Sequence, residues 1–101
     1  MRVAIDDAAA EELREARRWY AKEAGAPTAA RFLTEFQRLR IILAQEPLRG
    51  PEVEPDIRRL LFRERFPYSI MYVVRERRVV IVAVMHQHRE PGYWKERLEG
   101  L

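Results

Sequence analysis

The chain has 101 residues, a length that suits one domain with a modest core. It contains no cysteine, which excludes disulfides, a thiolate nucleophile and a cysteine-ligated metal centre. The formal charge of +3 is uneven, because residues 1–56 carry −2 and residues 57–101 carry +5. The basic second half favours an anionic partner. Since no run has the length of a signal peptide or membrane span, we expect a single cytoplasmic domain over residues 1–101, without membrane contact.

The first half of the chain predicts one strand and two helices. Residues 2–5 form a short β-type run, and Asp6 or Asp7 can cap a helix that follows it. Gly25, with a proline two residues later, ends this helix and starts a second one that runs to about Ala44. Apolar residues recur at helical spacing in both segments: Ala9, Leu13, Ala16, Tyr20 and Ala24, then Ala29, Phe32, Phe36, Leu39 and Leu43.

The second half of the chain predicts a loop and three strands. Residues 46–56 hold three prolines and a glycine, which indicates a loop. Runs rich in β-branched and aromatic residues follow at 57–63, 66–75 and 79–86, and their short spacing favours an antiparallel meander. The last two runs are apolar at nearly every position, so both faces of the sheet need a cover. Helices can cover one face, and the C-terminal tail, a second copy or a partner chain must cover the other.

These elements together predict an α+β fold in the order β-α-α-β-β-β. The two helices form a hairpin, and its apolar side packs on one face of a small antiparallel sheet. A polar and aromatic tail follows the last strand.

The Phe66-Pro67-Tyr68 element and the tail that contains His86, Arg89, Pro91 and Trp94 resemble the RelE/ParE-type toxins. The resemblance covers nearly the whole sequence, and the combination of a Phe-Pro-Tyr element with a His, Arg, Pro and Trp tail is its most specific part. The ending at Arg89-Glu90-Pro91 and Tyr93-Trp94 is closer to the ParE-like branch. The matching stretches are Trp19-Tyr20, Ala30–Phe32, the break at Pro47, Arg58–Arg63, Phe66–Val74, Ala83–Pro91 and Tyr93–Arg97.

The resemblance implies the toxin of a type II toxin–antitoxin pair, with a helical hairpin on a sheet and no cofactor. Its usual partner is a small antitoxin that binds operator DNA and wraps the toxin with its C-terminal segment, so this chain would meet operator DNA only indirectly. A basic, apolar sheet suits an acidic amphipathic segment that folds on binding. The antitoxin-binding candidates are Arg58, Arg59, Tyr72 and Arg75.

Two mechanisms occur among the RelE/ParE-type toxins that the chain resembles. RelE-like members cut mRNA in the ribosome without a metal, whereas ParE-like members bind DNA gyrase. We expect action on DNA gyrase, with a ribosome-dependent mRNA endonuclease or a non-toxic binding module as alternatives. The target-binding candidates are Arg63, Arg89, Tyr93 and Trp94.

If the chain cleaves RNA, the candidate acids and bases are His86, His88 and Tyr93. The candidate phosphate clamps are Arg63, Arg65 and Arg89. Structural roles remain open for the same residues: a backbone hydrogen bond for His86, an ion pair with Glu90 for Arg89, and fastening of the tail for Tyr93 and Trp94. The two histidines could also form a metal pair, but no third ligand lies near them in the sequence, so we expect no metal site.

Overall fold

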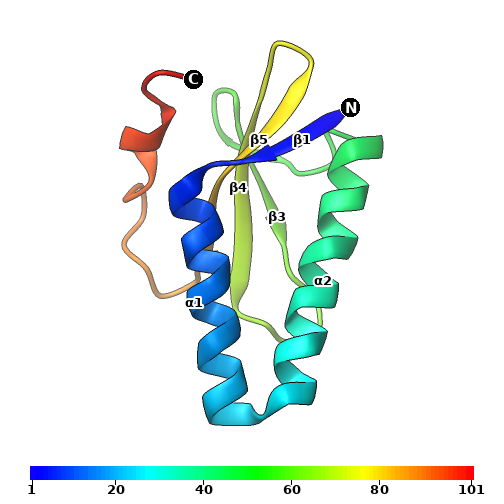
Figure 1. The fold of residues 1–101 in the computed structure, drawn as a ribbon. Helices are drawn as coiled ribbons and strands as arrows, with labels where there is room; N and C mark the ends of the chain where they lie inside the picture. The colour runs from blue at the N-terminus through cyan, green and yellow to red at the C-terminus, as the bar shows by residue number, and fades with distance from the viewer.

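The computed structural model describes residues 1–101 and contains two helices beside a five-stranded sheet (Figure 1). The α+β fold and the helical hairpin predicted from the sequence are both present. In chain order, the elements are β1 (Arg2–Ile5), α1 (Asp7–Ala24), α2 (Ala26–Gln45), β2 (Glu52–Glu54), β3 (Ile57–Leu61), β4 (Tyr68–Arg75), β5 (Arg78–His86) and the 3₁₀ helix η1 (Lys95–Leu98).

The sheet has the strand order β1-β5-β4-β3-β2. Strands β3, β4 and β5 form the expected antiparallel meander. The expectation of a purely antiparallel sheet is wrong, because β1 pairs with β5 in parallel, with Arg2 opposite Arg78 and Ile5 opposite Ile81. The helical hairpin between β1 and the rest of the sheet supplies the long crossover that parallel pairing requires.

The segment expected to be a loop at residues 46–56 also differs, since it contains the short strand β2. This strand pairs antiparallel with β3, with Glu52 opposite Arg58. The Arg58 guanidinium donates to the backbone oxygens of Leu48 and Gly50 and pairs with Glu52 at 3.3 Å. Arg58 therefore holds this acidic, proline-rich segment along the edge of the sheet.

The two helices begin and end where their capping residues allow. Asp6 is the N-cap of α1, and its carboxylate accepts from the Ala8 N–H at 3.0 Å. Gly25 separates α1 from α2 with a φ of 94°, a conformation that favours glycine. The buried stripe of α1 ends at Tyr20, so Ala24 is exposed rather than part of the core. Trp19 is also exposed, to 57%.

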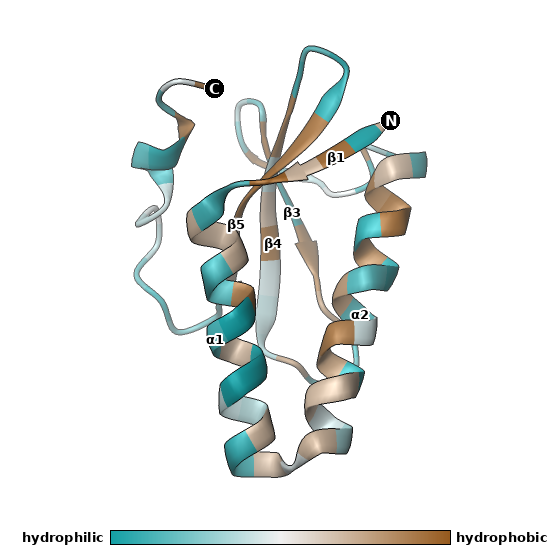
Figure 2. Cartoon of the chain, in the orientation of Figure 1, coloured by the Kyte–Doolittle hydropathy of each residue, from teal (hydrophilic) through white to brown (hydrophobic).

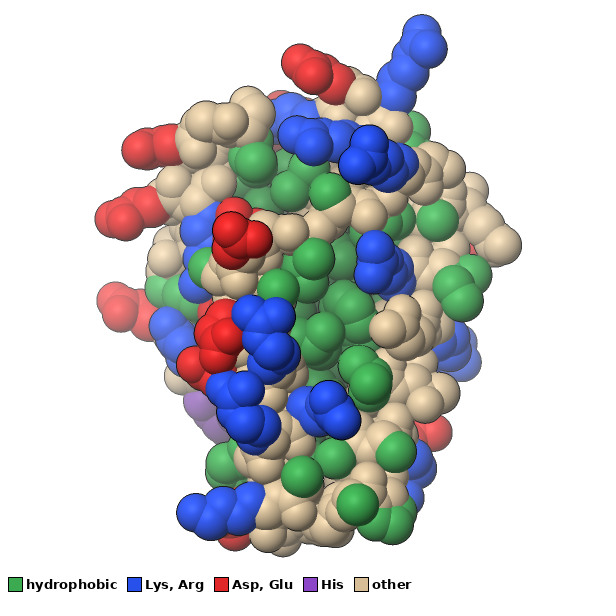
Figure 3. Space-filling view, viewed as in Figure 1, with side chains coloured by type: hydrophobic (Ala, Val, Ile, Leu, Met, Phe, Trp, Pro, Cys, Tyr) green, Lys and Arg blue, Asp and Glu red, His purple; other side chains and the backbone are tan.

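The helices cover one face of the sheet, and the tail covers the other. Hydrophobic colour marks much of the sheet, whereas α1 is largely hydrophilic and α2 carries both kinds of residue (Figure 2). Hydrophobic side chains also gather between the two helices in the space-filling view (Figure 3). The core on the far face of the sheet consists of Ile57, Met71, Val73, Val80, Val82, Ala83 and Trp94, with Met85, Tyr93 and Leu98 packed against it.

The sequence left three candidates to cover the second face of the sheet: the tail, a second copy or a partner chain. In the structure, the tail covers it. Trp94, in the tail, is 2% exposed and packs within this second core. Neither helix combines the length and apolar character needed to cross a lipid bilayer.

Candidate functional site

Glu12 on α1 fastens the tail to the sheet. Its carboxylate accepts hydrogen bonds from the Tyr93 hydroxyl at 2.6 Å, the Val84 N–H at 3.1 Å and the Arg97 guanidinium at 2.8 Å. Arg97 also donates to the Val82 oxygen at 2.9 Å. Strand β1 stops pairing with β5 at Ile81. Beyond that point, the side chains of Glu12 and Arg97 form hydrogen bonds with the backbone groups along the edge of β5.

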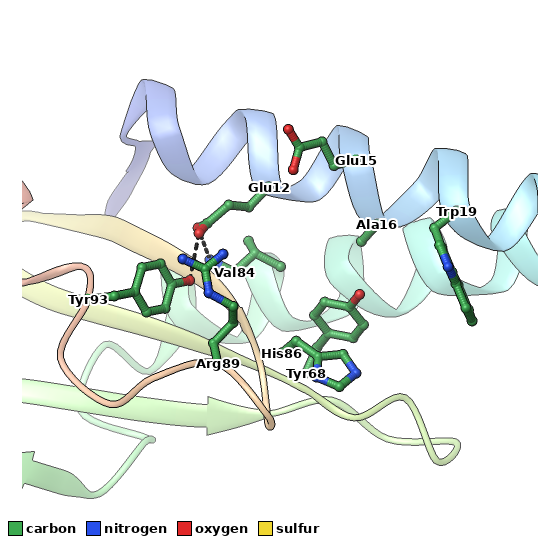
Figure 4. Close-up of a pocket in the computed structure, with 9 residues that line it drawn as sticks. All are labelled: Glu12, Glu15, Ala16, Trp19, Tyr68, Val84, His86, Arg89 and Tyr93. Atoms are coloured by element: carbon green, nitrogen blue, oxygen red, sulfur yellow. Dashed lines mark hydrogen bonds between the residues drawn. The ribbon is translucent and has the colours of Figure 1, made fainter.

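A cavity of about 230 Å³ lies beside this carboxylate, between α1 and the end of β5 (Figure 4). The Arg89 guanidinium stacks over the Tyr93 ring at 3.9 Å, a cation–π arrangement. Arg89 is exposed and forms no ion pair, so the alternative of a pair with Glu90 is not what the structure contains. The cavity is lined by Glu12, Glu15, Ala16, Trp19, Tyr68, Val84, His86, Arg89 and Tyr93.

His86 lines this cavity at the end of β5. Its Nδ1 accepts the backbone N–H of His88 at 3.0 Å, and its ring meets the edge of Tyr68 with centroids 5.0 Å apart. Burial, and then the neighbouring His88, lower the pKa of His86. The imidazole is therefore neutral at pH 7 with its proton on Nε2, and its remaining lone pair is engaged. His86 has the backbone-bonded role that the sequence left open.

Tyr93 is similarly committed to a structural contact. Burial, and then the hydrogen bond to Glu12, raise its pKa far above the ordinary value for a phenol. A phenol with a raised pKa is a weak acid and remains protonated at pH 7, so it cannot serve as a base. The Arg89 guanidinium stacks on the ring of Tyr93, while the hydroxyl of Tyr93 attaches the tail to α1.

Two of the residues expected at binding surfaces are buried. Tyr72 has no exposed surface, and its hydroxyl oxygen accepts the Gly50 N–H at 2.9 Å. Trp94 lies within the second core. Their aromatic rings fill the two faces of the sheet, which removes Tyr72 from the antitoxin surface and Trp94 from the target surface.

The remaining candidates are dispersed over the molecule. Arg59 is exposed and Arg75 is half-buried on the sheet. Arg63 and Arg65 are exposed in the turn between β3 and β4, and neither lines the cavity that contains Arg89. The phosphate clamps expected from the sequence are thus not brought together at one point.

Sequence reasoning missed the two charged residues that organise this site, Glu12 and Arg97. For Glu12 a signal was present, because it lies three residues after Ala9 and four before Ala16, both of which are buried. A carboxylate on that stripe has to face the interior and needs donors there. For Arg97 the sequence offered no comparable signal.

Residues 3–91 match the family model described as "ParE toxin of type II toxin-antitoxin system, parDE". A solved structure described as "Chromosomal ParDE TA system from P. aeruginosa" is similar in fold, with a TM-score of 0.74 and 22% sequence identity over 85% of this chain and 95% of that chain. The comparison with curated proteins found no significant match. Because the family model spans most of its length, the chain belongs to the ParE toxin family of type II toxin–antitoxin systems.

Proposed function

We propose that this toxin acts on DNA gyrase and inhibits growth by binding to its target rather than by cutting RNA. One observation carries the proposal: His86 and Tyr93, the two candidate acid–base residues that line the cavity with Arg89, are both engaged in holding the fold. His86 Nδ1 accepts a backbone N–H, and the Tyr93 hydroxyl donates to Glu12. The gyrase target itself comes from the resemblance to ParE-like proteins, and family membership supports it.

RNA cleavage would require groups that His86 and Tyr93, committed to their structural hydrogen bonds, do not offer. A base has to take the proton of the 2′-hydroxyl, an acid has to protonate the leaving oxygen, and cations have to stabilise the phosphate. Arg89 could serve as one cation, but Arg63 and Arg65 lie outside the cavity. An arginine stacked on a ring, in a cavity that an exposed tryptophan also lines, is instead typical of a protein-binding hot spot.

A cognate antitoxin is the second partner in this proposal. The formal charge of +5 on residues 57–101 suits an acidic, amphipathic segment of that antitoxin. Arg59 remains exposed for such a contact, whereas Arg58 is committed to the β2 segment. The similar solved structure is described as a ParDE system, which supports a paired antitoxin here as well.

The proposal is tested with purified chain in a DNA gyrase supercoiling and cleavage-complex assay, with and without the antitoxin encoded beside it. We expect loss of supercoiling or accumulation of cleaved DNA, and reversal by the antitoxin. A parallel reaction measures mRNA cleavage on programmed ribosomes. Ribosome-dependent cleavage with unaffected gyrase would replace this proposal with the RelE-like mechanism, and no effect in either assay would favour a non-toxic binding module.

A further inference from the structure

A second cluster of charged residues lies on α2, away from the cavity described above. Glu35 is 6% exposed and is the one charged residue that is buried. Its carboxylate accepts from Arg38 Nε at 2.7 Å and Nη2 at 2.9 Å, and from the backbone N–H of Arg63 at 2.6 Å. These three hydrogen bonds compensate for burial of the charge. They also attach the turn after β3 to α2.

This attachment creates a polar concavity of about 190 Å³ between α2 and the β3–β4 turn. Arg31, Thr34 and Arg38 share one face of α2, since they are separated by three and four residues. No hydrophobic side chain lines the concavity, which is bounded by Arg31, Thr34, Glu35, Arg38, Arg63 and Glu64.

The positive charges of two of these arginines are not paired with a carboxylate. Arg31 contacts only the Thr28 hydroxyl, at 3.1 Å, and the Arg63 side chain makes no hydrogen bond or ion pair. Arg38 is neutralised by Glu35, but its Nη1 is not used in that pairing. Glu64 opposes an anion here, because it lines the same concavity without pairing with an arginine.

We infer that this concavity binds a phosphate group of a nucleic-acid backbone. Arginine guanidinium groups match the geometry of a phosphate, and the Thr34 hydroxyl adds a neutral donor. The lack of an apolar lining disfavours a peptide, because the centres of protein interfaces are apolar and aromatic. Arg65, exposed on the same turn, extends the positive charge beyond a single phosphate, which favours a polymer over a free ion. Contacts of this kind position a nucleic acid without reading its bases.

The test measures binding of a fluorescently labelled DNA duplex to the full chain over a series of salt concentrations, without gyrase. We expect Arg31→Gln/Arg63→Gln to weaken binding about tenfold and to reduce the slope of log K against log salt by about one, because one phosphate contact is lost. Glu64→Gln is expected to tighten binding, because it removes the opposing charge. Arg17→Gln/Arg77→Gln is the matched control, since these two arginines are exposed and lie outside the concavity.

Several results would overturn the inference. Absence of salt-dependent binding by the wild-type chain is one of them, and an Arg31/Arg63 variant that binds like the Arg17/Arg77 control is another. Equal competition by inorganic phosphate at the same concentration would assign the site to a small ion, and equal competition by polyglutamate of matched charge would assign it to an acidic protein. Circular dichroism of each variant verifies the fold. Because gyrase is absent from this assay, its result is independent of the proposed function.

Discussion

The hydroxyl of Tyr93 donates a 2.6 Å hydrogen bond to Glu12, a residue 81 positions earlier in the chain. This contact joins the tail to the first helix across the edge of β5. Arg97 reaches the same carboxylate, and the Val84 N–H does so from the sheet. One carboxylate therefore links three segments that are distant in sequence, and the tail is an integral part of the fold.

Glu12→Ala should lower the free energy of unfolding by about 3 kcal/mol, because it leaves Arg97 and the Val84 N–H without their acceptor. Glu11→Ala is the neighbouring control. Its carboxylate pairs with Arg14 and Arg18 on the exposed side of α1, so its removal should cost much less stability than the loss of Glu12. Urea denaturation measures both variants, and equal losses would contradict the role assigned to Glu12.

Glu35 should make stability depend on pH in the acid range. Burial by itself raises the pKa of Glu35, but hydrogen bonds from Arg38 and the Arg63 backbone outweigh it, so the pKa lies below its ordinary value of 4.5. The unfolded chain therefore binds a proton more readily than the folded chain, and stability is lost as the pH falls below 4.5 and through the folded pKa.

Glu35→Gln should flatten this loss, although it also destabilises the protein at pH 7 by weakening the pairing with Arg38. Urea midpoints measured from pH 7 to about pH 3 give the two profiles. Glu15→Gln is the control, because Glu15 forms no ion pair and should keep the wild-type profile. An unchanged slope in Glu35→Gln would show that other carboxylates determine the acid response.

The turn between β4 and β5 should be open to stabilisation. Glu76 and Arg77 have φ angles of 49° and 65°, a left-handed conformation that side chains disfavour. Glu76→Asn/Arg77→Gly places the preferred residues of a two-residue hairpin there, and we expect a gain of about 1 kcal/mol in unfolding free energy. A double alanine variant should show no gain, because alanine also disfavours this conformation. A loss of stability in the Asn-Gly variant would disprove the backbone argument.

Arg89→Ala should weaken gyrase inhibition about tenfold while leaving the fold intact, since the guanidinium is exposed and stacks only on Tyr93. Inhibition by Arg89→Lys should lie between that of the wild type and that of Arg89→Ala, because lysine keeps the charge and loses the planar stacking. Arg17→Ala is the control: it removes an exposed arginine on α1, outside the cavity, and should keep full inhibition. Supercoiling assays rank the variants, and full inhibition by Arg89→Ala would exclude Arg89 from the target contact.

The sequence predicted the elements well because their signals are local. The cap at Asp6, Gly25 and the closely spaced β-branched runs each specify structure within a few residues. The parallel pairing of β1 with β5 was not predictable in this way, since it joins residues separated by nearly the whole chain.

The candidate site was only partly predictable for the same reason. The candidates His86, Arg89 and Tyr93 are close together in the sequence, at and just after the last predicted strand, and all three line one cavity. Local sequence gave no indication that Glu12 would capture the Tyr93 hydroxyl or that Glu35 would hold the turn at Arg63. Buried carboxylates depend on distant donors, and sequence spacing does not reveal them.

The parallel pairing of β1 also determines when the toxin becomes complete during its synthesis. Strand β1 is made before the other elements of the fold, yet its only partner strand, β5, is made after both helices and the other strands. Glu12 likewise cannot form its hydrogen bonds with Tyr93 and Arg97 until those residues have been made. The complete sheet therefore forms only after β5 and the tail have been made, because β1 and Glu12 find their partners there. A partner that recognises the finished sheet can bind only after that point.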